Sequence, residues 1–356
     1  MKIITMIRIL KEKPWIWRIP FLFLLMAGTV WAIRRHGKET SRAVQTEAMQ
    51  WYRQEGSVFG TLYHVTYEAE TDLQPALVAA LDSVDGSLSM FNEHSTLRRI
   101  NDNVDMQTDS MFCTLFRLAT QVSEATGGAF DVTVAPLVNA WGFGYKNGKL
   151  PDEAQTDSLR QLVDYRRVSL CEGKVVKEDP RMVMDFSAIA KGFGCDVVAE
   201  VFRTRGSRNF MVEIGGEIVV QGHNDKGQPW RVGVNKPVED DKNPNHELQE
   251  ILHLTDGAMA TSGNYRNFYT TGDGRRIAHT IDPHTGRPVQ HSLLSATVLA
   301  PTCAEADAFA TSFMVMGLDK AREVLQQQKQ LRAYLIYAEG EEFRVFTNLE
   351  SAATAP

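Results

Sequence analysis

The sequence lacks both of the glycine-rich loops that many proteins use to hold nucleotide phosphates. No GxxxxGK[ST] loop occurs in the 356 residues, and the GFG at residues 142–144 is followed by YKN, so it does not complete GxGxxG. An excess of basic charge is missing as well, since the formal net charge is −6. These absences exclude a Walker-type loop and a dinucleotide fingerprint, and they give no support to a general nucleic-acid-binding role.

Cysteine is scarce and scattered. The four cysteines form no CxxC pair and have no histidine at metal-ligand spacing. They permit three disulfide connectivities, but buried free thiols are the interpretation that this distribution favours. The residues are Cys113, Cys171, Cys195 and Cys303.

The first 35 residues have the pattern of a targeting segment. A mostly apolar run at residues 15–33 is interrupted by Arg18 and Pro20 and has basic residues on both sides. A charged stretch before an apolar core is typical of a secretory signal or of an uncleaved anchor, and this run is just long enough to cross a bilayer. We expect an anchor helix in residues 1–35, with a cleaved signal as the alternative. A polar linker is expected at 36–57, and everything after about Arg35 should lie outside the cytoplasm.

Hydrophobic periodicity predicts a mixture of strands and helices from residue 58 onward. Strands and helices alternate without a regular βαβ repeat, which favours an α+β fold over a doubly wound sheet. We expect one globular domain at residues 58–350 and a short tail at 351–356. The predicted elements are strands at 63–67, 210–214 and 230–234, helices at 73–88 and 109–125, and hairpins at 167–183 and 334–346.

Residues 302–317 predict a buried helix that carries polar groups. Thr302 and Glu305 have the spacing of a capping box, and the residues that follow are apolar nearly all round the helix. Asp307 and Thr311 nevertheless share one face, because they are four residues apart. A buried carboxylate needs a cation or hydrogen-bond donors, and carboxylate and hydroxyl oxygens suit Mg²⁺. The alternative is an aspartate bonded to a tyrosine or to a backbone amide.

Residues 184–202 predict a helix that Asp185 or Ser187 could cap. Gly192 and Gly194 fall in its first turns, where each costs roughly 1 kcal/mol relative to alanine, so we expect something to approach the backbone closely there. A helix start with a lysine one turn in, Lys191, suits a phosphate group. Tight packing of the helix through its glycines is the alternative.

Two further segments could line a pocket. In residues 127–144, Asp131 and Thr133 alternate just after a helix stop, among apolar and aromatic residues that suit either a pocket wall or a core. Phe91, between Met90 and Asn92, could stack on a ring, although a core phenylalanine is the alternative.

Residues 260–288 gather a serine, a tyrosine, a histidine and aspartates among turn residues. Reverse turns are predicted at 271–274 and at 282–286. Loops that carry titratable side chains between strands are frequent functional sites. A solvated hairpin with an ordinary surface histidine is the alternative.

Nine motifs follow one another across about 290 residues of the chain. They are FGTLYHVTY, MFNEHSTLRRIN, GGAFDVTVAPLVNAWGFG, DFSAIAKGFGCD, EIGGEI, WRVGV, ATSGNY, HTIDPHTGRPV and ADAFAT. Each motif alone is weak, but together and in this order they resemble the ApbE family, the FAD:protein FMN transferases. The resemblance implies an α+β fold with a mixed sheet and two lobes around a flavin cleft. It also implies transfer of FMN from FAD to a threonine or serine hydroxyl of a partner protein, with Mg²⁺ as cofactor and AMP as the other product.

The resemblance also implies a set of site residues. Mg²⁺ would be held by Asp307, Thr311 and the backbone carbonyl of Ala188, and His279 would be the general base. Lys191 would meet FAD. The residues that would line the flavin site are Phe59, Met90, Phe91, Asn92, Asp131, Thr133, Ser262 and Asp282.

The chain departs from the family's pattern at a few positions. Phe59 stands where a methionine is usual, which puts the adenine side of the pocket in question, and Thr280 and Glu217 replace the commoner Ile and Asp. The lipid-attachment cysteine of many relatives is absent. As in such relatives, we expect the catalytic domain on the periplasmic side of a bacterial inner membrane. The partner would be a flavin-carrying redox protein of that membrane or of the extracytoplasmic space, and we expect no nucleic-acid partner.

The implied chemistry suits these residue types. Phosphoryl transfer depends mainly on positioning and on neutralising oxygen charge, which Mg²⁺ can do. A hydroxyl is a weak nucleophile at neutral pH, so a histidine within hydrogen-bond reach helps to remove its proton. Two other functions stay open: a Mg²⁺-dependent pyrophosphatase that splits FAD into FMN and AMP, and an extracytoplasmic protein that binds FAD without chemistry.

Overall fold

The computed structural model describes residues 26–31, 48–143, 150–237, 248–264, 268–270 and 276–349. The chain divides into two units, Met1–Met49 and Gln50–Pro356. In the first unit residues 26–31 are helical, and most of the expected anchor falls outside the described residues. Within the described ranges, no helix has both the length and the apolar character needed to cross a membrane.

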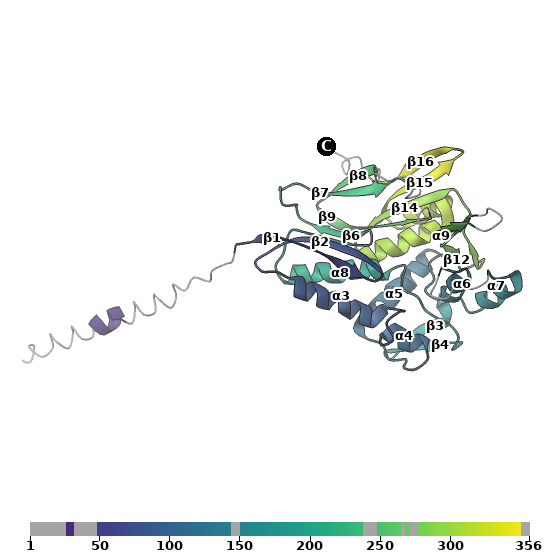
Figure 1. The fold of residues 1–356 in the computed structure, drawn as a ribbon, viewed down its shortest axis with the longest axis horizontal. Helices are drawn as coiled ribbons and strands as arrows, with labels where there is room; N and C mark the ends of the chain where they lie inside the picture. Colours follow the sequence, from purple (N-terminus) through teal and green to yellow (C-terminus); the bar gives the residue numbers. More distant parts are fainter. Residues whose placement is uncertain are drawn as a thin grey trace, which may run out of the picture. The chain divides into compact units, whose positions relative to one another are not determined.

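An eight-stranded sheet forms the centre of the second unit (Figure 1). Its strands, in spatial order, are β1 (Gln50–Val58), β2 (Thr61–Ala69), β5 (Phe210–Ile214), β6 (Glu217–Gln221), β9 (Asp256–Gly263), β14 (Leu293–Ala300), β15 (Arg332–Glu339) and β16 (Glu342–Thr347). Every neighbouring pair is antiparallel. The expectation of a mixed sheet is therefore wrong. The reason lies in the connections: β1–β2, β5–β6 and β15–β16 are joined by two-residue turns, which can only link antiparallel neighbours.

Four two-stranded hairpins accompany the large sheet. They are β3 (Val168–Cys171) with β4 (Lys174–Lys177), β7 (Trp230–Asn235) with β8 (Leu248–Leu254), β10 (Phe268–Thr270) with β11 (Arg276–Ala278), and β12 (Ile281–Asp282) with β13 (Arg287–Pro288). The strands predicted at 63–67, 210–214 and 230–234 and the hairpin predicted at 334–346 are confirmed. The hairpin predicted at 167–183 is present but shorter, because β4 ends at Lys177.

Helices cover one face of the sheet, and the β7–β8 hairpin packs on the other (Figure 1). The helices are α3 (Gln74–Leu88), α4 (Thr96–Asn101), α5 (Ser110–Ala125), α6 (Ala135–Ala140), α7 (Glu153–Arg160), α8 (Ala190–Thr204) and α9 (Cys303–Gln327), with a short 3-10 turn at Tyr165–Arg167. The predicted helices at 73–88 and 109–125 are confirmed as α3 and α5. Asp109 caps α5 by accepting a hydrogen bond from the Phe112 amide.

Helices α8 and α9 lie against the middle strands and against each other. Two of the three hydrophobic clusters meet at Phe59 and Val197, which contact both. The residues from Gln50 onward therefore form one compact unit, and the expectation of two lobes is wrong.

Two other expectations need correction. The linker predicted at 36–57 ends earlier, because residues 50–57 belong to β1, which pairs with β2 along its whole length. All four cysteines are free, but only Cys195 and Cys303 are buried, whereas Cys113 is half-buried and Cys171 is exposed.

Candidate functional site

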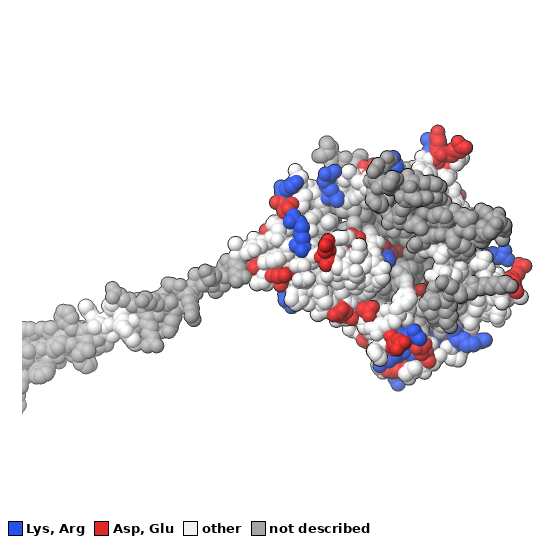
Figure 2. Space-filling model, viewed as in Figure 1, with Lys and Arg blue, Asp and Glu red and all other residues white. Residues whose placement is uncertain are grey.

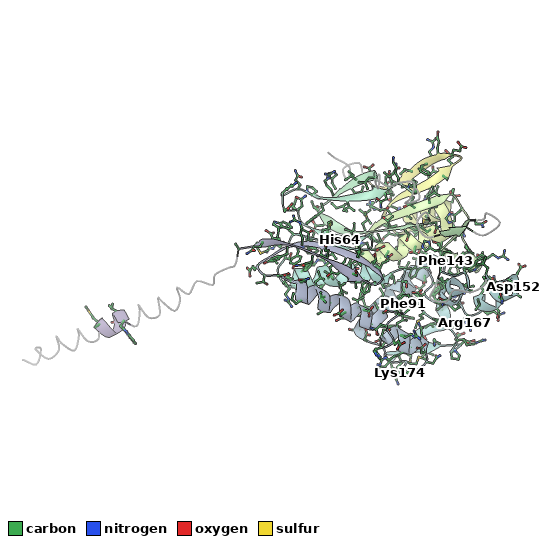
Figure 3. All side chains as sticks on the ribbon, viewed as in Figure 1. His64, Phe91, Phe143, Asp152, Arg167 and Lys174 are labelled. Atoms are coloured by element: carbon green, nitrogen blue, oxygen red, sulfur yellow. The ribbon has the colours of Figure 1, made fainter. Side chains whose placement is uncertain are left out.

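A cleft of about 990 Å³ opens where α8 and α9 pass the strands β6 and β9. Nine of the thirteen residues expected at the site line this cleft. They are Met90, Phe91, Asp131, Ala188, Lys191, Ser262, His279, Asp307 and Thr311. Phe91, labelled in Figure 3, is 74% exposed and also borders the cleft. On the face seen in Figure 2, acidic and basic side chains of the described residues are interspersed.

One lysine and two carboxylates form the charged centre of the cleft. The Nζ atom of Lys191 (α8) lies 2.7 Å from Oε1 of Glu217 (β6) and 3.8 Å from Oδ2 of Asp307 (α9). Both carboxylates are 2% exposed. Burial raises the pKa of Glu217 to about 8 and also raises the pKa of Asp307, and the Lys191 ammonium opposes both shifts. Burial alone would lower the pKa of Lys191, but the charges of Asp307 and Glu217 outweigh it and leave that pKa raised.

This centre has the chemistry of a cation site. When both carboxylates are ionised, Lys191 balances only one of them, so one negative charge remains. Oε2 of Glu217 is buried without a hydrogen-bond partner, which leaves an acceptor to be satisfied. The hydroxyls of Ser262 and Thr311 lie 3.2 Å apart beside Asp307 in the same cleft. Carboxylate and hydroxyl oxygens are hard ligands of the kind that Mg²⁺ prefers, so the residues present fit that ion.

A cation here would have few protein side chains around it. Among the described residues, no group of three or more histidine, cysteine, aspartate or glutamate side chains is arranged to hold a metal. Mg²⁺ commonly binds through one or two carboxylates and completes its shell with substrate phosphates and water. The cleft is therefore suited to a cation that binds together with a phosphate-bearing ligand.

The charged centre depends on an unusually close approach of α8 to the start of α9. A Cβ atom added to Gly192 would lie 2.3 Å from the backbone oxygen of Cys303, so only glycine fits there. The Gly192 amide donates a 3.1 Å hydrogen bond to Oδ2 of Asp307. At Gly194 the neighbour is Phe59, whose ring would lie 2.7 Å from an added Cβ. The two glycines are thus explained by packing within the protein, which was the alternative to close approach by a ligand.

A carboxylate from α8 caps α9 and holds the two helices together. Asp196 accepts hydrogen bonds from the amides of Cys303 and Ala304, at 2.8 and 2.9 Å. The Thr302 hydroxyl accepts a further bond from the Glu305 amide at 3.2 Å, which confirms Thr302 as the cap. Burial raises the pKa of Asp196 to about 6 despite these amides, which favour its charged form. Asp307 is therefore positioned by contacts made one turn before it.

His279 enters the cleft from the segment that leads into β12. Its ring lies 6.3 Å from the ring of Phe143 in an edge-on arrangement, and both residues line the cleft (Figure 3 labels Phe143). The Thr280 hydroxyl, next in the chain, donates a 2.6 Å hydrogen bond to the side-chain oxygen of Asn264. The histidine is thus placed on the wall of the cleft by a segment with defined hydrogen bonds.

The turn after β12 is tied to two other parts of the chain. The Gly286 amide bonds to the carbonyl of Asp282 at 2.8 Å, which confirms the reverse turn predicted at 282–286. His284 Nδ1 lies 3.1 Å from Asp282 Oδ1, and its Nε2 lies 3.0 Å from the Gly127 carbonyl oxygen. The Trp141 indole donates to the Gly286 carbonyl at 2.8 Å. The turn predicted at 271–274 lies outside the described residues.

A family model matches residues 59–335, most of the chain, and its description is the ApbE family. The chain belongs to the ApbE family.

Relatives with known names and structures agree with this assignment. The FAD:protein FMN transferase of Vibrio cholerae is 36% identical over 283 residues, covering 76% of this chain and 83% of that protein. The one from Haemophilus influenzae is 37% identical over 298 residues, covering 79% and 85%. The solved structure of the Vibrio cholerae flavin transferase ApbE superposes with a TM-score of 0.76 at 33% identity, covering 84% of this chain and 97% of that one. The apo flavinyl transferase ApbE of Pseudomonas stutzeri gives 0.76 at 27% identity, covering 86% and 97%. The α+β fold implied by the ApbE resemblance is thereby confirmed.

Four of the expected site residues do not line the cleft: Phe59, Asn92, Thr133 and Asp282. Phe59 packs on Gly194, and the Asn92 amide donates to Oδ2 of Asp85 at 2.8 Å. Asp282 faces His284, as described above.

Asp131 and Thr133 form one hydrogen-bonded unit. Oδ1 of Asp131 accepts from both the amide and the hydroxyl of Thr133, at 2.7 and 2.6 Å, and its Oδ2 accepts from the Tyr165 amide at 2.9 Å. The Thr133 oxygen accepts in turn from the Asp164 amide at 2.9 Å. Burial raises the pKa of Asp131, and these bonds oppose the shift. Asp131 borders the cleft, while Thr133 lies fully buried behind it.

The start of α8 differs from its prediction. Neither Asp185 nor Ser187 caps the helix, because it begins at Ala190 with Ile189 at the cap position and no side-chain bond there. Asp185 instead accepts from the amide and hydroxyl of Ser187, at 2.7 and 2.5 Å. Both residues border the cleft.

Two residues important to this site escaped the sequence reasoning. Glu217 was named only as a departure from the family pattern, and Asp196 appeared only as the last residue of a quoted motif, with no role assigned to either. Both are acids within mostly apolar elements, α8 and β6, and a buried acid in such an element is the signal that could have marked them.

Proposed function

We propose that this chain transfers FMN from FAD to a threonine or serine hydroxyl of a partner protein and releases AMP. The observation that carries the proposal is the cleft itself, where the Asp307 and Thr311 face of α9 and His279 line one cavity. This is the arrangement that a phosphoryl transfer to a hydroxyl requires, because it places a cation site and a proton acceptor around one space. Membership of the ApbE family supports the same reaction.

The cation would be Mg²⁺, held by Asp307, Thr311 and the carbonyl of Ala188. When bound, Mg²⁺ would neutralise negative charge on the pyrophosphate oxygens of FAD. Asp307 is suited to this role because its carboxylate is kept in place by the Gly192 amide and by the packing of α9. Ser262 places its hydroxyl beside that of Thr311 and orients it.

His279 would take the proton of the acceptor hydroxyl. The hydroxyl oxygen forms a bond to the phosphorus of the FMN half, and the bond between that phosphorus and the bridging pyrophosphate oxygen breaks. AMP leaves with the bridging oxygen, and the proton passes to the imidazole. Phe91 and Phe143 offer aromatic surfaces at the cleft that suit an isoalloxazine or adenine ring.

The place of action is part of the proposal. The basic and apolar pattern of residues 1–35 supports an anchor in a bacterial inner membrane, with the second unit on the periplasmic side and an acceptor protein in or near that membrane. Alkaline phosphatase fused after residue 356 should be active in a bacterial host, and an inactive fusion at equal expression would place the domain in the cytoplasm.

The test of the reaction uses the full chain with FAD, Mg²⁺ and a purified flavin-acceptor protein. The intact mass of the acceptor should rise by one FMN residue, and EDTA should prevent the change. Disappearance of FAD with an unchanged acceptor mass would replace the transferase by a pyrophosphatase. Binding of FAD without turnover, at any Mg²⁺ concentration, would leave a binding protein only.

A further inference from the structure

Lys191 has two carboxylate neighbours but is bonded to only one of them. Its Nζ lies 2.7 Å from Glu217 Oε1, which is the length of a charge-assisted hydrogen bond. The 3.8 Å to Asp307 Oδ2 is beyond hydrogen-bond reach. Glu217 therefore holds the ammonium group, while Asp307 is left with the Gly192 amide on that oxygen.

The position of Lys191 decides whether a cation can bind Asp307. An ammonium bonded directly to Asp307 would occupy an oxygen that a cation needs, and it would also repel the cation. The flexible four-carbon stem of a lysine lets its charge move between neighbouring partners. Only about 1 Å separates the present distance from a hydrogen bond to Asp307, and the 2.7 Å bond to Glu217 holds Nζ at that distance.

We propose that Glu217 is a positioning residue that keeps Lys191 off Asp307 and so leaves this carboxylate available to the divalent cation. The inference rests on the cation site proposed above. It gives a role to a fully buried glutamate that the transfer reaction itself does not use.

The change in net charge could by itself weaken cation binding in a Glu217 variant. Substitutions can distinguish this charge effect from a positioning role of Glu217. With both carboxylates ionised, the centre of Lys191, Glu217 and Asp307 carries a net charge of −1; Glu217→Gln makes it 0, and Lys191→Gln makes it −2. The double variant returns it to −1. If each charge acted independently, Glu217→Gln would weaken cation binding equally with and without Lys191. Under the proposal, the substitution matters only while a lysine is present to move.

The experiment is a titration of the full chain with Mn²⁺, run without FAD and with saturating FAD, in which the free ion is followed by electron paramagnetic resonance. It is run at pH 8.5 under nitrogen, above the pKa of about 8 to which burial raises Glu217. Glu217→Gln should bind Mn²⁺ at least about tenfold more weakly than the wild type, whereas in the Lys191→Gln background the same substitution should change affinity by less than about threefold. Equal effects in both backgrounds, or no loss in Glu217→Gln, would overturn the proposal.

Two controls identify the site and the residue. Glu213→Gln removes another cleft-lining glutamate, one bonded to His64 (labelled in Figure 3) and to the Gly216 amide rather than to Lys191. It should change Mn²⁺ affinity by less than about twofold, and a loss equal to that of Glu217→Gln would also overturn the proposal. Asp307→Asn should abolish binding. If it binds as the wild type does, or if the wild type binds no Mn²⁺ with or without FAD, the cation site itself is refuted and the inference fails with it.

Discussion

Replacing Gly192 with alanine adds a methyl group where α8 and the start of α9 leave no space for one. The new Cβ would lie 2.3 Å from the carbonyl oxygen of Cys303, 2.6 Å from its carbon and 2.8 Å from the Ala304 nitrogen. All three neighbours are backbone atoms, so no side chain can rotate away. Since ordinary contacts begin at 3.4 Å, the helices must separate by about 1 Å.

The expected loss of stability follows from three contributions. Overpacking of this kind costs about 1–3 kcal/mol. Separation of the helices also weakens the 3.1 Å bond from the Gly192 amide to the buried Asp307 carboxylate, and a hydrogen bond to a charged group is worth about 1.5–3 kcal/mol. The higher helix propensity of alanine offsets at most about 1 kcal/mol of this loss in the free energy of unfolding. The free energy of unfolding should therefore fall by roughly 2–4 kcal/mol.

The assay is urea unfolding followed by tryptophan fluorescence, with Gly86→Ala as the matched control. Gly86 also lies inside a helix, α3, but a Cβ added there meets nothing within 4 Å. The control should be more stable than the wild type by about 0.5–1 kcal/mol. Gly192→Ala should also bind Mn²⁺ more weakly, because Asp307 moves with α9. If Gly192→Ala is as stable as the control, the close approach of the two helices is refuted.

Three further predictions concern other residues. His279→Ala should bind FAD as the wild type does but transfer FMN at least about 100-fold more slowly, as expected for loss of a general base; a wild-type rate in the acceptor-mass assay would place the base elsewhere. Asp196→Asn should be less stable, because one acceptor oxygen cannot serve both amides at the start of α9. Because burial raises the pKa of Asp196 to about 6, above its ordinary 3.8, its carboxyl contributes stability that is present below pH 4 and lost as the pH rises through 6. The stability difference between wild type and Asp196→Asn should thus be larger at pH 4.5 than at pH 7 in urea titrations, and equal differences would contradict the pKa. Tyr67→Phe should lower the free energy of unfolding by about 1–2 kcal/mol without changing the transfer rate, because it removes a 2.6 Å bond to Asp72 far from the cleft; altered transfer at equal folded fraction would contradict this.

Local patterns in the sequence predicted most of the elements correctly. Apolar spacing located α3 and α5, and the cap at Thr302 marked the start of α9, because these features depend on residues within one or two turns of each other. The shared face of Asp307 and Thr311 follows from helix geometry alone, so it could be predicted too. The mixed sheet was a wrong expectation, since strand order and direction depend on pairings between segments far apart in the chain.

The side-chain contacts that join different elements around the cleft could not be predicted in the same way. The bond between Lys191 and Glu217 joins α8 to β6, and the cap that Asp196 supplies joins α8 to α9, which is more than 100 residues away. Periodicity carries no information about such pairs. The glycines at 192 and 194 did signal a close approach, but whether a ligand or the protein itself came close was decided only by the packing of Cys303 and Phe59.

Transfer of FMN to a partner protein is tested by the ratio of AMP released to FMN attached during turnover of FAD by the full chain. Both products are measured in one reaction that contains the acceptor protein and Mg²⁺, AMP by chromatography and attached FMN by the intact mass of the acceptor. We expect one AMP for each FMN attached, and no attachment by the Asp307→Asn variant. AMP formed in step with free FMN, on an acceptor whose mass does not change, would contradict it.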